Sequence, residues 1–332
     1  MPIALLDTTS AEALLRQRGL VRGPVRIREL SGGVSNVVLA VEADGQRLVM
    51  KQSLERLRVE AEWLAPRRRI LAEAAGLRVA AALDPASVPR VVDIDPETML
   101  LVMEMAPEGT DDWKRKLMAG EIDADFARHV GRLVGRMHAE TAGAPLPREL
   151  TDDPAAFEAL RLDPYHEAVA RALPELADAV RAVADRIRRE RVCLVHGDLS
   201  PKNVLVLPGG APHAWLIDLE VAHRGDPAFD VAFMLTHLVM KAVHRRADRA
   251  RYDAAADAFL AGYAEHRRIP DDDALLPQLG CLLLARVVGK SPADYLSPPE
   301  RDVVRALGAA AVTGGAGSLN ELRERRSREW DR

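Results

Sequence analysis

The chain has 332 residues, of which 48% are hydrophobic and 29% charged, and its formal net charge is −4 at pH 7. This length suggests roughly two domains, and the charge balance gives no reason to expect a nucleic acid or a membrane as a partner. The start of the chain lacks a signal-peptide pattern, and no apolar run approaches the roughly twenty residues of a membrane span, so we expect a cytoplasmic protein.

Residues 25–52 have the pattern of three strands. VRIREL alternates apolar and polar side chains, residues 36–41 are rich in valine and leucine, and Asp44-Gly45 is a hairpin turn signal before RLVMKQ. The third strand carries Lys51 near its end.

The connection between the first two strands contains a pair of glycines. Glycines allow backbone N–H groups to approach phosphate oxygens closely. A glycine hairpin without a ligand is the commoner case, but the lysine on the third strand favours a phosphate-binding hairpin. Its candidate nucleotide-binding residues are Ser31, Gly32, Gly33, Ser35 and Asn36.

The lysine of such a hairpin needs an acidic partner. Residues 57–75 are helical in composition, with a proline that restarts the helix near its middle. Three glutamates compete for the role, and we favour Glu73, on the second helical segment, over Glu60 and Glu62. Residues 91–94 and 99–105 form two more apolar runs, so we expect five strands and a helix in this part of the chain.

From Thr110 onward the sequence is predominantly helical. Residues 126–141 place apolar side chains on one stripe. His138 lies on the same helix, and we expect it to be a hydrogen-bonded core residue.

The most informative stretch reads LVHGDLSPKNVL and is followed by WLIDLE. A polar loop carries Asp198 and Asn203, and a second apolar run leads to Asp218 and Glu220. Carboxylate and amide oxygens at strand ends suit Mg²⁺, which prefers hard oxygen ligands and shares them with substrate phosphates. The spacing from Asp198 to Asn203 also fits the kinase catalytic loop, in which the aspartate receives the substrate hydroxyl proton and the asparagine binds metal.

These motifs resemble those of the aminoglycoside phosphotransferase and choline kinase superfamily of protein-kinase-like small-molecule kinases. The His-Gly-Asp form separates that superfamily from protein kinases, which have His-Arg-Asp. A tryptophan-containing insert before Arg69 and Glu73 is similar to methylthioribose kinases, as is the Asp-x-Glu pattern of Asp218 and Glu220.

The resemblance implies an α+β, bilobal protein-kinase-like fold that binds ATP between its lobes. Residues 1–103 are the predicted nucleotide-binding lobe, with an antiparallel sheet and a helix, and residues 104–332 the larger, mostly helical lobe for catalysis and substrate binding. Position in the resemblance also assigns the hinge that contacts adenine. Its predicted residues are Glu104, Met105 and Ala106, with Met103 at the back of the pocket.

The mechanism we predict is ATP-dependent phosphorylation of an alcohol hydroxyl with Mg²⁺. Asp198 and Asn203 are the predicted catalytic pair, with Asp198 orienting and deprotonating the acceptor. The predicted metal ligands are Asn203, Asp218 and Glu220. Lys51, held by its glutamate, binds the α- and β-phosphates.

The short sequence separation between Asp218 and Asp230 predicts a small-molecule acceptor. Only eleven residues separate them, too few for the activation segment and docking platform of a protein kinase. Asp230 is expected to accept hydrogen bonds from the catalytic loop backbone. Arg286 and Lys290, four residues apart near a helix end, either interact with the helix dipole or contact the substrate or the transferring phosphate.

Elimination favours a neutral sugar or related polyol as the acceptor. Aminoglycosides are polycations that call for an acidic surface, and a choline-type cation calls for an aromatic cage, whereas aromatic residues make up only 4% of the chain. The alternatives are an aminoglycoside phosphotransferase and a catalytically silent nucleotide-binding module, the latter disfavoured because Lys51, Asp198, Asn203 and Asp218 are all present. We expect ATP and a small hydroxyl compound as partners, and a monomer or homodimer.

Overall fold

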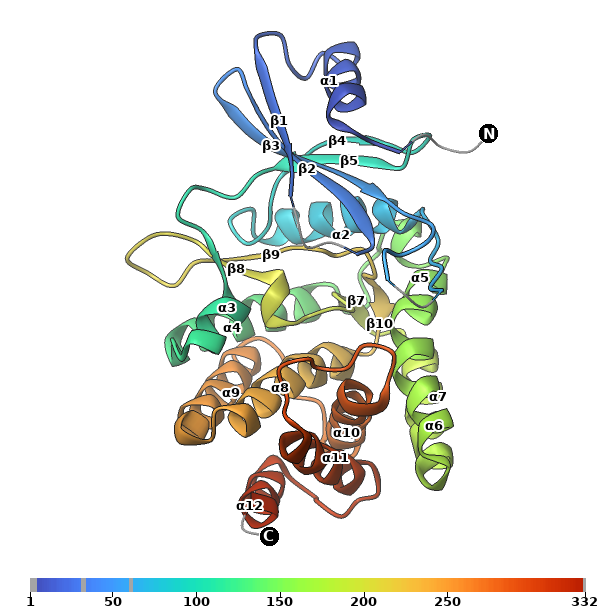
Figure 1. Cartoon of the computed structure of the whole chain (residues 1–332), viewed down its shortest axis with the longest axis vertical. Helices are drawn as coiled ribbons and strands as arrows, with labels where there is room; N and C mark the ends of the chain where they lie inside the picture. Colours follow the sequence, from blue (N-terminus) through green and yellow to red (C-terminus); the bar gives the residue numbers. More distant parts are fainter. Residues whose placement is uncertain (1–4, 31–33, 60–61, 331–332) are drawn as a thin grey trace.

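The computed structural model describes residues 5–30, 34–59 and 62–330. A small part containing an antiparallel sheet lies above a larger, mostly helical part (Figure 1). This arrangement confirms the predicted α+β, kinase-like fold. The boundary between residues 103 and 104 stays a prediction. Among the described residues, no helix is long and apolar enough to cross a membrane.

The N-terminal sheet is antiparallel, with the strand order β1-β2-β3-β5-β4. Alternate side chains of the central strands face two helices on opposite sides of the sheet. The turn between β2 and β3 has positive φ at Asp44 (53°) and Gly45 (73°), as the predicted hairpin requires. The elements of this part are α1 (Thr8–Gln17), β1 (Val25–Glu29), β2 (Asn36–Ala43), β3 (Gln46–Ser53), α2 (Arg69–Leu83), β4 (Val91–Asp95) and β5 (Leu100–Glu104).

The helix predicted for residues 57–75 is found only in its second part, and the prediction for the part before Pro66 is wrong. In its place Arg56 and Leu64 form an isolated antiparallel bridge, and helix begins only at Arg69. Trp63 Nε1 donates to the carbonyl of Ala159, 2.9 Å away in the helical part. Tertiary contacts therefore override the local helical composition of this segment.

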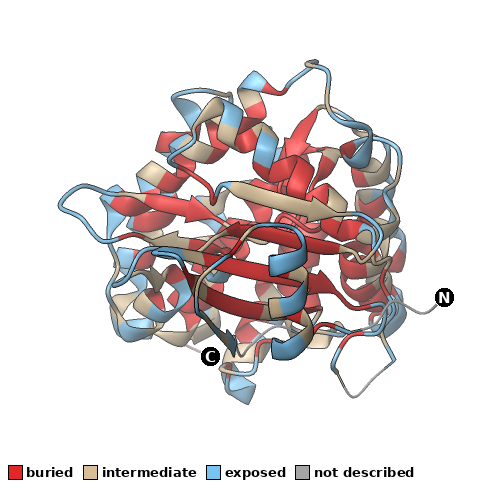
Figure 2. Ribbon diagram, turned by 90° about the horizontal axis from the view of Figure 1, so that it is seen from above, coloured by how far each residue is buried: buried red, intermediate tan, exposed pale blue. Residues whose placement is uncertain are grey.

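The larger part is built around α8, whose residues are buried on nearly every side. Figure 2 shows buried residues concentrated in strands and in the helix faces that pack together, with exposed residues at loops and helix ends. The helices are α3 (Trp113–Ala119), α4 (Ala124–Glu140), α5 (Ala155–Phe157), α6 (Ala168–Ala172), α7 (Ala177–Arg189), α8 (Pro227–His244), α9 (Arg249–Ala264), α10 (Asp272–Val288), α11 (Pro298–Val312) and α12 (Leu319–Trp330).

Short strands and turns carry the polar loops at the top of this helical part. The strands pair as β6-β8-β9 and as β10-β7. They are β6 (Asp111–Asp112), β7 (Cys193–Val195), β8 (Val204–Val206), β9 (Ala214–Leu216) and β10 (His223–Gly225), and the short helical segments are η1 (Arg148–Leu150), η2 (Glu158–Glu167), η3 (Pro174–Leu176), η4 (Pro201–Asn203) and η5 (Arg246–Asp248).

Candidate active site

The loop after β7 is held by the first turns of α8. Asp230 accepts hydrogen bonds from the backbone N–H groups of His196 (2.6 Å) and Gly197 (2.9 Å), which confirms its expected role. His196 Nε2 lies 3.0 Å from the carbonyl of Ile217 and so ties the loop to the segment after β9. Gly197 has φ +75°, and a Cβ there would lie 2.6 Å from the carbonyl oxygen of Val221. Only glycine fits this backbone position.

A buried histidine supports this loop from below. His138 Nε2 lies 3.1 Å from Asp230 Oδ2, and its Nδ1 lies 3.0 Å from the hydroxyl of Tyr263. The side chains of His138 and Asp230 are both fully buried. His138 is thus the hydrogen-bonded core residue that the sequence predicts.

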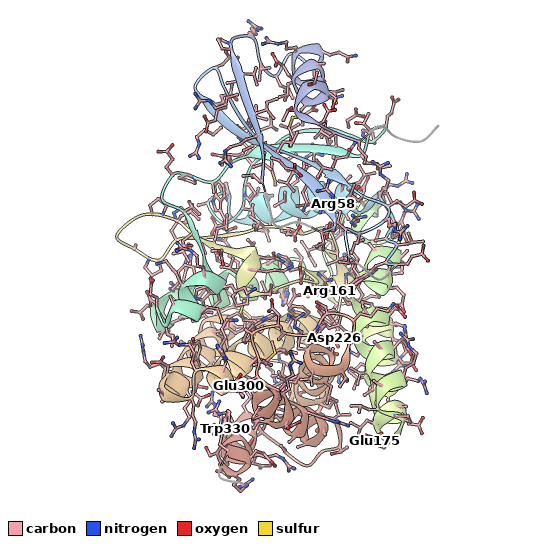
Figure 3. All side chains as sticks on the ribbon, in the orientation of Figure 1. Arg58, Arg161, Glu175, Asp226, Glu300 and Trp330 are labelled. Carbon is pink, nitrogen blue, oxygen red and sulfur yellow. The ribbon has the colours of Figure 1, made fainter. Side chains whose placement is uncertain are left out.

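Asp198 is surrounded by donors and is almost completely buried. Its carboxylate lies 2.8 Å from Arg161, 3.1 Å from Lys202 Nζ and 2.7 Å from Asn203 Nδ2. Burial opposes ionisation, but the charges of Arg161 and Lys202 outweigh it and lower the pKa of Asp198. Figure 3 shows Arg161 between the sheet-containing part and the helices below it.

Lys51 connects the two parts of the molecule. Its Nζ lies 2.8 Å from Glu73 Oε1 and also contacts Asp218 Oδ1. The predicted choice of Glu73 as the partner of Lys51 is therefore confirmed. Burial favours the neutral amine, but the carboxylates of Asp218 and Glu73 outweigh it and raise the pKa of Lys51.

The two carboxylates beside this lysine have pKa values shifted in opposite directions. Glu73 is fully buried, and burial raises its pKa to about 7 despite the neighbouring ammonium. Burial also opposes ionisation of Asp218, but Lys51 and Lys202 outweigh it and lower the pKa. Asp218 has φ +67°, a left-handed backbone that is uncommon for residues other than glycine. Such strain is often found at functional sites.

Glu220 joins α2 to the loop between β1 and β2. Its carboxylate accepts hydrogen bonds from Ser35 Oγ (2.9 Å) and Asn36 Nδ2 (2.9 Å). It also pairs with Arg69, whose Nε lies 3.0 Å away and whose side chain is fully buried. Ser35 and Asn36 are thus held beside the segment that carries Asp218. The other predicted residues of this hairpin, Ser31, Gly32 and Gly33, lie outside the described residues.

The site offers the hard oxygen atoms that a divalent cation needs. Carboxylate oxygens of Glu73, Asp218 and Glu220 all lie within 4.8 Å of one another. The amide nitrogen of Asn203 donates to Asp198, which leaves its carbonyl oxygen as the group available to a metal. The donor set therefore fits Mg²⁺.

The strand that leads into the predicted hinge is β5. Met103 is buried in the sheet. Glu104 N–H donates to the carbonyl of Arg90 (2.9 Å) and Met105 N–H to that of Arg47 (3.0 Å). Met105 N–H is thus engaged within the protein, and Ala106 N–H is the next hinge donor along the chain.

The two predicted substrate cations have protein partners. Lys290 Nζ lies 2.7 Å from Asp163 Oδ2 at an exposed position. Arg286 is half-buried near the end of α10 and donates to Ser291 Oγ at 2.8 Å. Lys290 thus pairs with a carboxylate of another segment, and the roles of Lys290 and Arg286 in substrate binding stay predictions.

Sequence reasoning missed two residues beside Asp198. Lys202 could have been predicted, since a residue four positions after Asp198 in the same loop can place its side chain beside the carboxylate. Arg161 carries no sequence signal, because it lies in the π-helical segment η2 and reaches Asp198 only through the fold.

The fold and this constellation define a protein-kinase-like small-molecule kinase. The family model described as the phosphotransferase enzyme family (APH) matches residues 26–274. The chain belongs to this family, as the sequence motifs predict. Family membership makes it a phosphotransferase with a small-molecule hydroxyl acceptor, which uses ATP and a divalent metal.

Individual relatives are distant. A methylthioribose kinase from Exiguobacterium sibiricum is 26% identical over 275 residues, covering 73% of this chain and 68% of the relative. An amicoumacin kinase in complex with AMP-PNP and Ca²⁺ has a TM-score of 0.57 at 17% identity, covering 98% of this chain and 96% of that one. A choline kinase from Streptococcus pneumoniae has a TM-score of 0.52 at 13% identity, covering 98% of both chains. These structural likenesses show the fold.

Proposed function

We propose that this protein transfers the γ-phosphate of ATP, with Mg²⁺ as the metal, to a hydroxyl group of a sugar or related polyol. The observation that carries the proposal is that Lys202 interacts both with Asp198 of the catalytic loop and with Asp218, the partner of Lys51. Lys202 forms an ion pair with Asp198 (3.1 Å), and the charge of Asp218 also raises its pKa. The catalytic loop and the Lys51–Asp218 pair are thus parts of one site.

The nucleotide is bound from the N-terminal side in this proposal. Lys51, oriented by Glu73, binds the α- and β-phosphates. Ser35 and Asn36 contribute to nucleotide binding from the hairpin. Adenine contacts the hinge through the Glu104 carbonyl and the Ala106 N–H, because Met105 N–H already donates to Arg47.

Asp218 and the Asn203 carbonyl are the proposed Mg²⁺ ligands, with Glu220 as an additional ligand. When bound, the metal neutralises charge that develops on the β- and γ-phosphate oxygens. Before it binds, Asp218 is paired with Lys51, and Glu220 with Arg69. The charge of Lys51 helps to lower the pKa of Asp218, and the two ion pairs hold both carboxylates in place for a cation.

Asp198 acts mainly by orienting the acceptor. Its lowered pKa makes it a weak base, and in a loose phosphoryl-transfer transition state the acceptor proton leaves late. The acceptor oxygen forms a bond to the γ-phosphorus as the bond to the β-phosphate oxygen breaks. ADP departs, and the hydroxyl proton passes to Asp198 and then to solvent. Arg161 keeps Asp198 ionised and fixed.

Substrate-dependent ADP release tests the proposal directly. A coupled assay with Mg·ATP and a panel of sugars, sugar acids, aminoglycosides and amino alcohols should show turnover with a polyhydroxy acceptor, and turnover lower by about 10²–10⁴-fold with the Asp198→Asn variant. Turnover with aminoglycosides alone would favour the runner-up function. ATP binding without ADP release for any acceptor would leave the silent nucleotide-binding module. A cytoplasmic location stays a prediction.

A further inference from the structure

A stripe of α8 leads away from the catalytic loop into the helical part. Phe233, His237 and Lys241 are spaced four residues apart, so they lie on one face of the helix. The guanidinium of Arg161, which pairs with Asp198, lies 5.9 Å from the centre of the Phe233 ring. The Phe233 and His237 ring centres are 5.5 Å apart. The stripe thus begins beside the proposed acceptor-binding aspartate.

Lys241, at the far end of this stripe, is a buried cation that lacks a carboxylate partner. Its side chain is fully buried, yet no ion pair with its Nζ forms within residues 5–30, 34–59 and 62–330. Its contacts are the His237 carbonyl at 3.5 Å and the face of the Tyr295 ring at 5.8 Å. A fully buried lysine is almost always paired, because isolating its charge from water costs several kcal/mol.

Further cations surround Lys241. Burial, followed by the charges of Lys114 and Arg286, lowers the pKa of Lys241 to about 7, with Asp112 as the one opposing charge. Burial and the cations Lys241, Arg286, Lys202 and Lys114 lower the pKa of His237 as well. We call Lys114, Lys241 and Arg286 the cationic cluster, and His237 lies beside it.

The cationic cluster also leaves hydrogen-bond donors without partners. Arg286 Nε and the Tyr295 hydroxyl are both buried and have no hydrogen-bond partner in the described structure. Asp112, the nearby acid, caps α3 by accepting from Arg115 N–H at 2.7 Å. Buried donors are usually paired, and an acceptor that binds at this place would satisfy both.

Some side chains at the cluster reach solvent, although Lys241 does not. Lys114 is exposed, and His237, Arg286 and Tyr295 are half-buried. α10, which carries Arg286, packs against α8, and α3, which carries Lys114, contacts the loop segment η4 that contains Lys202. Three elements therefore bring positive charge to one place, next to the loop that carries Asp198.

We propose that the cationic cluster binds an anionic group of the acceptor, a carboxylate or a phosphate, so that the substrate is an acidic sugar or polyol rather than a neutral or cationic one. This inference rests on the proposed function. The acceptor would place a hydroxyl at Asp198 and its acidic group along the α8 stripe at Lys241 and Arg286. A polycationic acceptor would meet repulsion there.

Inorganic sulfate is a suitable probe for an anion site, because it carries its full negative charge at neutral pH. Calorimetry with protein saturated by Mg·AMP-PNP, which fills the phosphate sites of the nucleotide, should show sulfate binding. Lys241→Met should weaken it by about 10-fold or more, and Lys114→Ala, an exposed change that spares the fold, by roughly 3- to 10-fold. Lys116→Ala is the matched control, because it removes the same charge from the same helix but from an ion pair with Glu121.

The acceptor role is tested with three related sugars that differ in charge: anionic glucuronate, neutral glucose and cationic glucosamine. The expected order of kcat/KM is glucuronate above glucose above glucosamine, with sulfate competing against the acceptor and not against ATP. Absent sulfate binding, or equal weakening by Lys114→Ala and Lys116→Ala, would overturn the anion site. Faster turnover of glucose or glucosamine would overturn the inference and leave the proposed function intact. Lys114-dependent sulfate binding without ADP release from any acceptor would overturn the proposed function, and the acceptor role with it, but not the anion site.

Discussion

The N-terminal side of the candidate active site and the α8 side each contain a buried lysine, but only the lysine on the N-terminal side has carboxylate partners among the described residues. Lys51 is enclosed by Glu73 and Asp218, whereas Lys241 has no described carboxylate partner and has Arg286 as a neighbouring charge. Lys51 is therefore paired before any ligand binds, whereas in our proposal Lys241 gains a partner only when an anion binds. This difference separates a preformed ATP site from a site adapted to a particular acceptor.

The largest effect is expected at the centre of the nucleotide side. Asp218→Ala should reduce turnover to background, because in our proposal the bound phosphates lose a carboxylate ligand of their metal, and Lys51 loses one partner. The coupled ADP assay with Mg²⁺ titrated from micromolar to millimolar measures this. Wild-type Mg²⁺ dependence in the variant would remove Asp218 from the metal site.

A slightly smaller effect is expected from the acceptor side. Asp198→Asn keeps the size of the side chain but removes its charge, so kcat should fall by about 10²–10⁴-fold. Orientation accounts for much of this loss, since the pKa of Asp198 is lowered by its neighbours despite burial. Steady-state kinetics at saturating ATP and acceptor gives the ratio. A kcat within a few-fold of wild type would show that Asp198 does not meet the acceptor.

Stability measurements test whether the two buried lysines differ as described. Lys51→Met leaves the buried Glu73 and the half-buried Asp218 without their cation and should lower the free energy of unfolding by about 3–5 kcal/mol. Lys241→Met removes a buried charge without a carboxylate partner and should raise the free energy of unfolding by about 1–3 kcal/mol.

Urea unfolding at pH 7 measures both lysine variants. Opposite signs are the expected outcome. A destabilised Lys241→Met would mean that its ammonium has a compensating partner and that the two regions do not differ as described.

The smallest effect concerns pH. Burial lowers the pKa of His166 and of His223 from 6.5 to about 4. The unfolded chain binds more protons in this interval, so stability is present above pH 6.5 and is lost as pH falls toward 4, by about 1–3 kcal/mol per histidine. His166→Gln should flatten this dependence in urea unfolding at pH 6.5, 5 and 4. An unchanged slope would show that His166 is protonated in the fold.

Local signals explain why much of this molecule could be predicted from its sequence. The Asp44-Gly45 hairpin depends on a two-residue turn, and the catalytic loop depends on spacing within one short stretch. The pairing of Lys51 with Glu73 followed from the order of strand and helix, the proline that restarts the helix and the resemblance of Arg69 and Glu73 to methylthioribose kinases. Such features are encoded by residues close together in the chain.

Tertiary features were not predictable in the same way. The composition of residues 57–65 indicates a helix, but Trp63 bonds to the distant Ala159 and the segment forms a bridge. Arg161 and Lys241 acquire their roles only because helices pack around the catalytic loop, so no spacing in the sequence marks them. The acceptor site depends on such contacts more than the nucleotide site does.

One measurement tests most directly whether the two sides have separate tasks. Calorimetric titration of Mg·ATP into Asp198→Asn and Asp218→Ala compares them under one set of conditions. The expected result is a Kd within a few-fold of wild type for Asp198→Asn and one weaker by about 10-fold or more for Asp218→Ala. Equal losses of ATP affinity in the two variants would contradict the division between a nucleotide side and an acceptor side.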